Sequence, residues 1–400
     1  MLGLTRQVTY QIPRLSRQDH DVHAGQKQVQ AAVPPVRRKP GKFRVTADDL
    51  MVAIPTDDQH IPLVEASRHW RKRIRTLIAT NNTELAEQRN EAGRGINEAW
   101  QFYPDDKPLR ALHPGDTRAA VAPFMAHTVF GDSYKWCLYG DDDTVWFIDG
   151  ILDLVQDIDP DMPYFITDHL WWSSINNTIG NHPNLEAPRC LPCGHEPEGM
   201  IGADGWKPFN APIGCPCTAE LLCNTDDRNI FEDDCSIPRH PIRTYSMHGG
   251  AGGLVSVGLL RILGYQRMID CVESLHSTGG DAFITICLWF HGYAHTDPGY
   301  SFYHPEMRMF DPGPEDSAGV MYALSEAVLD RCDPSCKHLV DHMVTSHVRS
   351  RKAASIEAAA QTIRLLSNAY DSYIEHRTKQ TEQVAKGSKE LHEQQAVVSR

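Results

Sequence analysis

The sequence lacks the features that would place it in a membrane or on a nucleic acid. No run of roughly 18 or more apolar residues occurs, so the chain as given contains no candidate transmembrane helix. Residues 1–10 lack the apolar core of a secretory signal peptide. An excess of basic residues is also missing, because the formal net charge is −13, and this argues against general nucleic-acid binding. With 41% hydrophobic and 23% charged residues, the composition is that of a globular protein.

The 400 residues divide by composition into a basic leader, an α/β region and a helical C-terminal part. Residues 1–45 carry nine Lys or Arg residues and two acidic ones without sustained periodicity, which predicts a weakly ordered leader. Residues 46–312 are expected to form the α/β domain, with a long Pro-, Gly- and Cys-rich excursion at 173–240. Helices are expected over 313–375, followed by a polar tail at 376–400.

Apolar runs and helical spacing predict a series of strands and helices within the α/β region. Strands are expected over 75–80, 136–139, 145–148 and 164–167, and helices over 85–100, 117–130, 150–156, 254–263 and 281–291. Alternation of this kind is typical of an α/β domain.

The most informative stretch is an acidic triplet, Asp141 to Asp143, between two short apolar runs. Three carboxylates between buried strands would repel one another in a low-dielectric setting, so a cation is expected beside them. A hard divalent ion such as Mg²⁺ or Mn²⁺ is the simplest candidate, because it binds through one or two carboxylates plus substrate phosphates. The structural alternative is a solvated acidic turn, since Asp is common in turns.

Three further stretches and a tryptophan pair carry candidate site residues. Gly249–Gly253 contains four glycines in five residues, which suits either a tight turn without ligand or a wall close to a substrate. Asp281 stands at the start of an expected helix, where N-capping is its structural alternative. His304 follows an aromatic run and is either a structural histidine or a ligand. Trp171 and Trp172 suit core packing or stacking on a sugar face.

Six of the eleven cysteines lie in the excursion between Cys190 and Cys235. Zinc is one interpretation of this cluster, although the pair Cys215 and Cys217 has a single intervening residue where zinc sites usually have two or more. Disulfides that staple a loop without its own core are favoured, because an even number of cysteines in an irregular segment is typical of an oxidising compartment. The cluster consists of Cys190, Cys193, Cys215, Cys217, Cys223 and Cys235, with His195 nearby. Outside the cluster, Cys332 and Cys336 are expected to pair, whereas Cys137, Cys271 and Cys287 are expected to be buried thiols.

Taken in order, these stretches resemble the Fringe-like branch of glycosyltransferase family 31. The resemblance rests on Tyr139–Thr144, Gly249–Gly253, Gly279–Asp281 and the late His304. It covers roughly residues 115–312, and the leader and the C-terminal helices lie outside it.

The resemblance implies a GT-A fold, a Rossmann-like sheet with a nucleotide-sugar site at the strand ends, here with the Cys-rich insertion and C-terminal helices added. It implies an enzyme that transfers a sugar from a UDP-sugar to a hydroxyl of a glycan or glycoprotein acceptor, with inversion, usually through a β1,3 link, and with Mn²⁺ or Mg²⁺. By position, it implies metal contacts from Asp141, Asp143 and His304; donor contacts from Asp141, Asp142, Gly250 and Gly252; general base action by Asp281; and acceptor stacking by Trp171 and Trp172.

Relatives of this kind are usually Golgi membrane proteins, so the resemblance implies the Golgi or secretory lumen. The cysteine cluster and the Asn-x-Thr sequons at Asn81 and Asn176 agree with that location. Because no anchor is visible, the expectation is a shortened gene model or a soluble form.

Two other functions remain open at this point. One is a metal-dependent phosphoester hydrolase that uses the acidic triplet, Asp281 and His304 around a metal-bound water. The other is a non-catalytic binding protein stabilised by zinc within Cys190–Cys235. Only the second predicts stoichiometric zinc and loss of the fold on chelation.

Overall fold

The structure is a computed structural model that describes residues 42–92, 97–106, 113–172, 191–193, 246–275, 279–300, 308–312 and 317–398. Among these residues, no helix combines the length and the apolar composition that crossing a bilayer requires.

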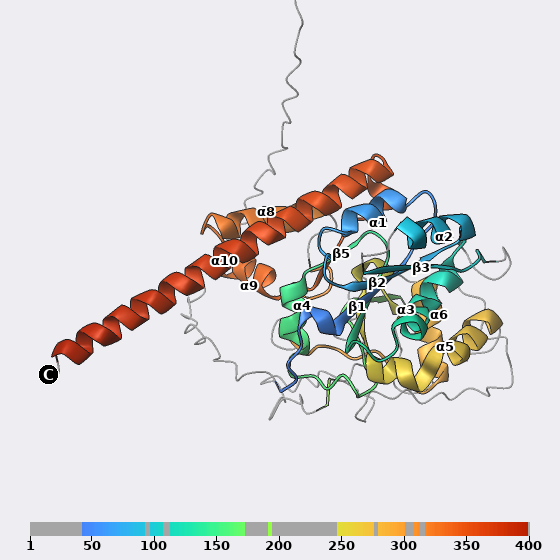
Figure 1. Cartoon of the computed structure of the whole chain (residues 1–400), viewed down its shortest axis with the longest axis horizontal. Coiled ribbons are helices and arrows are strands. Elements are labelled where there is room, and N and C mark those ends of the chain that lie inside the picture. Colours follow the sequence, from blue (N-terminus) through green and yellow to red (C-terminus); the bar gives the residue numbers. More distant parts are fainter. Residues whose placement is uncertain are drawn as a thin grey trace, which may run out of the picture. The chain divides into compact units, whose positions relative to one another are not determined.

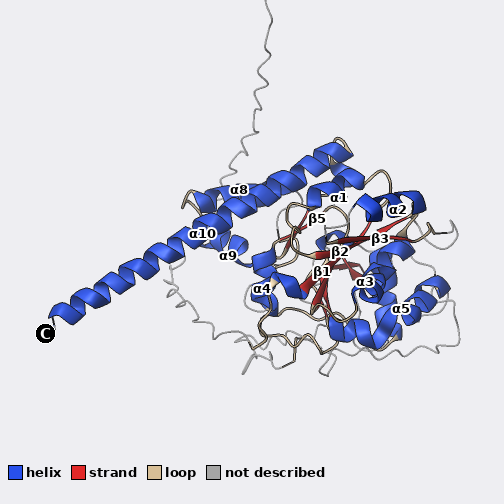
Figure 2. Cartoon of the chain, in the orientation of Figure 1, coloured by secondary structure: helices blue, strands red, loops and turns tan. Residues whose placement is uncertain are grey.

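A mostly parallel six-stranded sheet lies at the centre, in the order β3-β2-β1-β4-β9-β6 (Figure 2). Its strands are β1 (Leu50–Pro55), β2 (Arg75–Thr80), β3 (Glu98–Phe102), β4 (Trp136–Tyr139), β6 (Phe165–Ile166) and β9 (Gly253–Ser256). β1 pairs in parallel with both β2 and β4, and β2 pairs in parallel with β3. β9 runs antiparallel to β4 and β6. This mixed α/β sheet is compatible with a Rossmann-like fold.

Helices cover both faces of the sheet (Figures 1 and 2). The helices are α1 (Ile61–Ser67), α2 (Thr83–Ala92), α3 (Asp116–Phe130), α4 (Ile148–Val155), α5 (Val257–Ser274) and α6 (Gly280–Phe290). Along β1, Met51 and Ala53 pack in the core with α3, α5 and α6, whereas Leu50 and Val52 pack in the core with α1, α2 and α4. The alternation follows from the two-residue period of a strand, and it explains why β1 is apolar throughout.

A third apolar cluster joins the C-terminal helices to the α/β part. These helices are α8 (Ser317–Val328), α9 (Pro334–His342) and α10 (Ile356–Val398). Figure 1 shows α10 running beside α1 and α8, and Val145 and Phe147 belong to the same cluster. Two small antiparallel sheets complete the described part, β5 (Thr144–Trp146) with β10 (Thr345–His347) and β7 (Leu170–Trp172) with β8 (Ser246–Met247). Short 3₁₀ helices span Ala47–Asp49 (η1), Gly249–Ala251 (η4) and Ser350–Lys352 (η5).

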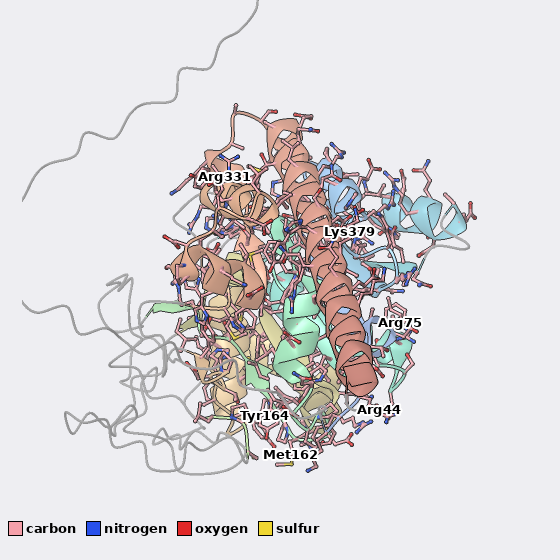
Figure 3. The ribbon with its side chains drawn as sticks, turned by 90° about the vertical axis from the view of Figure 1, so that its left-hand side faces the viewer. Arg44, Arg75, Met162, Tyr164, Arg331 and Lys379 are labelled. Atoms are coloured by element: carbon pink, nitrogen blue, oxygen red, sulfur yellow. A yellow bond between two sulfur atoms is a disulfide. The ribbon has the colours of Figure 1, made fainter. Side chains whose placement is uncertain are left out.

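Helix α10 continues through the expected polar tail. Among the α10 residues whose side chains are described, Tyr370 and Tyr373 are the last buried ones, and the residues from Thr378 to Gln383 are exposed. Figure 3 labels Lys379 in this exposed part of the helix. An i,i+4 pair joins Glu375 to Lys379 at 2.6 Å and stabilises the exposed helix slightly.

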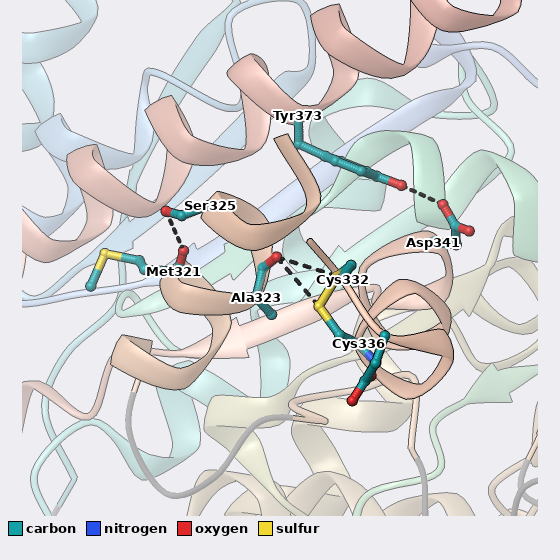
Figure 4. The surroundings of a disulfide bond; sticks show 8 residues. Met321, Ala323, Ser325, Cys332, Cys336, Asp341 and Tyr373 are labelled. Atoms are coloured by element: carbon teal, nitrogen blue, oxygen red, sulfur yellow. Dashed lines mark hydrogen bonds between the residues drawn. A yellow bond between two sulfur atoms is a disulfide. The ribbon is translucent and has the colours of Figure 1, made fainter. Parts of the chain in front are cut away.

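Two disulfides occur among the described cysteines. The expected pair Cys332–Cys336 is confirmed, and it lies against the carbonyl of Ala323 on α8 (Figure 4). The expectation of buried thiols is confirmed for Cys137 and wrong for Cys271 and Cys287. Those two form a disulfide because the packing of α5 against α6 brings their Cα atoms within 5.9 Å.

In the Cys-rich excursion only Cys193 is described, and it is disulfide-bonded. Cys190, Cys215, Cys217, Cys223, Cys235 and His195 lie outside the described residues. The zinc alternative for the whole cluster therefore stays a hypothesis, although the one described member takes part in a disulfide.

The expected elements are confirmed where a segment is apolar on its own, as at 75–80, 117–130 and 136–139. The helix expected over 85–100 is wrong over 98–100, because Glu98–Phe102 pairs with β2 instead. The helix expected from Leu254 is wrong at its start, where Gly253–Ser256 forms the strand between β4 and β6. Both errors have one cause, since neighbouring strands override the local helical spacing.

A buried ion cluster ties β3 to α1. Glu98 accepts bonds at 2.7 Å from both Arg68 and Arg71, and the side chains of Glu98 and Arg71 are 4% and 3% exposed. Burial opposes ionisation of Glu98, but the two guanidinium groups outweigh it and lower the pKa of Glu98 to about 2.

Replacing Glu98 by Gln should destabilise the fold by about 3–5 kcal/mol, because Arg71 would stay buried without its counter-charge. The stabilisation from Glu98 is fully present above pH 4.5 and is lost as the pH falls through about 2. Urea unfolding at pH 7 measures the difference. The matched control is Glu87→Gln at an exposed position of α2, expected within about 0.5 kcal/mol of wild type. Equal stability of E98Q and wild type would contradict this account of the cluster.

Candidate functional site

A cavity of about 390 Å³ opens at the carboxyl ends of β1 and β4. The strand order runs outward from β1 in both directions, so the connections after β1 and β4 diverge and leave a crevice between them. β1 contributes Pro55 and Thr56, and β4 is followed directly by Asp141 to Asp143. The remaining wall comes from the starts of α3 and α6, the Gly-rich segment and the chain after β10. Topology alone places the acidic triplet where α/β sheets bind ligands.

The middle carboxylate of the triplet is tied to the end of β1. Oδ2 of Asp142 accepts a hydrogen bond from the hydroxyl of Thr56 at 2.9 Å and lies 3.0 Å from Nδ1 of His60. The bond to Asp142 raises the pKa of His60 to about 9, so His60 is cationic at neutral pH. Burial raises the pKa of Asp142 itself, against the opposing effect of His60. Asp142 therefore closes the turn against β1.

The outer two carboxylates meet a histidine that comes from far along the chain. β10 pairs with β5 in a register that sets His347 opposite Thr144, next to Asp143. One ligand atom each from Asp141, Asp143 and His347 all lie within 4.8 Å of one another. Nε2 of His347 is 3.2 Å from Oδ1 of Asp143, and within the described part of the chain that buried oxygen makes no hydrogen bond. Two carboxylates and one imidazole fit a divalent ion such as Mn²⁺ or Mg²⁺.

The charges of Asp141, Asp143 and His347, together called the triad, are unequally compensated. Burial opposes ionisation of Asp143, but His347 and the Ser350 N–H outweigh burial and hold the pKa of Asp143 below its usual range. Burial lowers the pKa of His347, and the charges of Asp143 and Asp141 outweigh burial, so this pKa is raised overall. Asp141 is accessible at the cavity wall, yet burial of its carboxylate and the charge of Asp143 raise its pKa to about 7. A bound divalent cation would favour the ionised form of both carboxylates.

The Gly-rich segment forms a floor on which the triad is packed. A Cβ on Gly250 would lie 2.3 Å from the His347 ring, and a Cβ on Gly249 would lie 3.0 Å from Oδ1 of Asp141. Gly252 adopts φ +75°, and a Cβ there would lie 2.8 Å from Trp146. Gly250 lines the cavity, whereas Gly252 packs against Trp146 and is not among the described residues of the cavity wall. The glycines are therefore needed for close approach.

Asp281 lies in the first turn of α6 on the cavity wall. Its Oδ2 accepts from the N–H of Gly249 at 3.2 Å, and its Oδ1 accepts from the N–H of Ala282 at 2.8 Å. These bonds and the helix N-terminus favour a carboxylate. Asp116 at the start of α3 also lines the cavity, and burial and the charge of Asp281 raise the pKa of Asp116 to about 6.

Positive groups surround the same cavity. Arg118 comes from α3, and Arg349, Arg351 and Lys352 come from the chain directly after β10. Carboxylates at the centre and cations at the rim suit a ligand that carries negative charge and binds through a metal ion.

The sequence predicted part of this arrangement. Asp141, Asp142, Asp143, Gly250 and Asp281 do line one cavity. His304 lies outside the described residues, as do the side chains of Trp171 and Trp172, whose backbone forms part of β7. His347 was missed because the whole region after residue 313 was expected to be helical. The short run Val344-Thr345-Ser346-His347-Val348, rich in β-branched residues, is the signal that could have predicted β10.

Comparison of the sequence with models of known protein families gives no match, and comparison with curated proteins gives no related sequence.

Replacing His347 by Ala should weaken Mn²⁺ binding by at least roughly tenfold, because it removes a ligand. Gly250→Ala should also weaken binding, because its Cβ would displace the His347 ring. Calorimetric Mn²⁺ titration of folded variants measures both effects. If Gly250 acts through His347, the double variant binds no more weakly than His347→Ala alone. His376→Ala on α10 is the control, expected to bind like wild type; additive losses in the double variant would contradict the contact.

Proposed function

We propose that this chain is a metal-dependent glycosyltransferase that moves a sugar from a UDP-sugar to an acceptor hydroxyl. The proposed transfer inverts the anomeric carbon and forms a β1,3 link, and the proposed fold of the sheet is of the GT-A type. The observation that carries the proposal is the meeting of Asp141, Asp143 and His347 at the carboxyl ends of β1 and β4, in a cavity with a basic rim. A nucleotide-sugar presents to such a site a diphosphate that needs both a metal and cationic side chains.

Each group of the site has a part in that reaction. Asp141, Asp143 and His347 would hold Mn²⁺ or Mg²⁺, which stabilises the negative charge that develops on a leaving diphosphate. Asp142, fixed by Thr56 and His60, keeps the acidic turn closed at the end of β1. The basic side chains of the rim would hold the phosphate oxygens.

Asp281 is the proposed general base. It stands on the wall of the same cavity as an N-terminal carboxylate of α6. There it would take the proton from the acceptor hydroxyl as the hydroxyl oxygen attacks the anomeric carbon and the bond to the diphosphate breaks. The bond from the Gly249 N–H fixes one of its oxygens and so sets the direction of the carboxylate.

The Golgi or secretory lumen is the proposed location. The disulfides Cys271–Cys287 and Cys332–Cys336 support it, because disulfides persist in oxidising compartments. Of the two sequons, Asn176 lies outside the described residues. Asn81 donates to Asp105 at 2.9 Å, a bond that a glycan on the same nitrogen would weaken.

UDP should bind the wild-type protein only when Mn²⁺ is present, and Asp143→Ala should abolish that binding, because the metal links the phosphates to the protein. Calorimetric titration of UDP with and without Mn²⁺ measures this. Asp371→Ala, an exposed carboxylate on α10, serves as the control. Absence of UDP binding in well-folded wild type, together with hydrolysis of a phosphoester substrate, would overturn the transferase in favour of a hydrolase.

Asp281→Asn should keep Mn²⁺-dependent UDP binding within a few-fold while lowering turnover by about 10²–10⁴-fold, since general base catalysis contributes that much. Release of UDP from candidate UDP-sugars in the presence of acceptor gives the turnover. An unchanged rate in D281N would exclude Asp281 as the base and leave the metal site unaffected.

A further inference from the structure

The chain makes a sharp, strained turn directly after the metal-binding histidine. Arg349 has φ 56° and ψ 59°, the left-handed conformation that is unfavourable for a non-glycine residue. Asp143 fixes the turn on both sides, since its carbonyl accepts from Val348 N at 3.0 Å and its Oδ2 accepts from Ser350 N at 2.7 Å. A proposed metal ligand therefore sets the direction of Arg349.

The guanidinium group of Arg349 has few partners for its donors. Its side chain is 22% exposed and lines the cavity. Nη2 makes a long contact of 3.5 Å with Oδ2 of Asp311, and Nε is buried with no hydrogen-bond partner among the described residues. A guanidinium carries five N–H donors, and leaving them unpaired in a buried place costs free energy. An anionic ligand in the cavity would supply the missing acceptors.

Asp311 connects Arg349 to His347. Its side chain is 6% exposed, and its Oδ1 accepts from the backbone N–H of His347 at 3.0 Å while its Oδ2 faces Arg349. Its own N–H donates to the hydroxyl of Thr345 at 2.9 Å, which fixes it to β10. One buried carboxylate thus holds both the histidine strand and the arginine.

We propose that Arg349 binds the phosphate groups of the ligand beside the metal site, and that Asp311 is the positioning residue that aims it. The planar guanidinium group of Arg349 can donate to two oxygens of one phosphate. A metal ion held by Asp141 and Asp143 would bind the oxygens of a neighbouring phosphate. The ligand class is therefore a nucleoside diphosphate rather than a monophosphate. This inference deepens the proposed function and rests on its metal site.

Arg351 and Lys352 also line the cavity, but both are exposed. Contacts of exposed charges are weakened by water and salt, so these residues contribute less per contact than the partly buried Arg349. Among the basic residues after β10, Arg349 is therefore the side chain expected to contribute most to phosphate binding.

The test compares Mn²⁺, inorganic pyrophosphate, UDP and UMP by calorimetry on the full chain. Arg349→Gln should leave the affinity for Mn²⁺ alone unchanged and weaken pyrophosphate and UDP by about 10–100-fold, the range expected for hydrogen bonds to a charged group. UMP should change less, so the ratio of UDP to UMP affinity falls. Arg349→Lys, which keeps the charge without the fork, should recover part of the loss. Arg364→Gln, exposed on α10, is the matched control.

Asp311→Asn separates positioning from folding. Asn can still accept the His347 N–H, so Mn²⁺ affinity should hold, while loss of the charge beside Arg349 should weaken UDP by about 3–10-fold. Unchanged pyrophosphate affinity in R349Q, or no Mn²⁺-dependent pyrophosphate binding in wild type, would overturn the inference. Arg349-dependent binding of pyrophosphate and UDP, without release of UDP from any UDP-sugar in the presence of acceptor, would support the inference and contradict the proposed transferase, so the two can fail separately.

Discussion

The candidate site depends on the interactions of one buried carboxylate, Asp143. Its backbone carbonyl and its side chain both bind the chain after β10, and one of these bonds joins residues 207 positions apart. The same side chain lies 3.2 Å from His347. The pairing of β5 with β10 therefore brings His347 to the Asp143 carboxylate, and the bonds of Asp143 in turn stabilise the chain after β10. Without that pairing, the acidic turn would keep His60 beside Asp142 but would lack His347 and the cations that follow it, Arg349, Arg351 and Lys352.

Close packing behind the site explains several small residues. A Cβ on Gly150 of α4 would lie 2.2 Å from the carbonyl of Met343, just before β10, and a Cβ on Gly250 would strike His347 from the other side. Glycine at both positions lets β10 lie between α4 and the Gly-rich floor. In the third apolar cluster, Val145 and Phe147 pack among the C-terminal helices, and this packing stabilises the pair of strands β5 and β10. Packing of the C-terminal helices thus supports the strands that carry the site. The α/β domain had been expected to end at residue 312, before these helices.

Local patterns predicted those parts of the fold whose stability is local. The helix Asp116–Phe130 and the strands Arg75–Thr80 and Trp136–Tyr139 are apolar segments of suitable length, and they form as expected. Residues 98–100 and 254–256 were expected to be helical and lie in strands β3 and β9, because each segment lies beside a strand already in the sheet. Cys271 and Cys287 look like core thiols in sequence and become a disulfide only when α5 packs against α6.

By itself, the sequence determined the α/β class, the acidic triplet at the end of an apolar strand, the need for close approach at the glycines and a carboxylate at the start of α6. All of these are properties of short segments, where residue type and spacing are sufficient. The tertiary structure decided which residues face one cavity. It brought His347, Arg349 and Asp311 to the triplet by pairing a strand of three residues, Thr345–His347, with β5. The β-branched run around this strand marks it in the sequence but does not identify its partner. Strand pairing across about half the chain, rather than any local pattern, makes this a site.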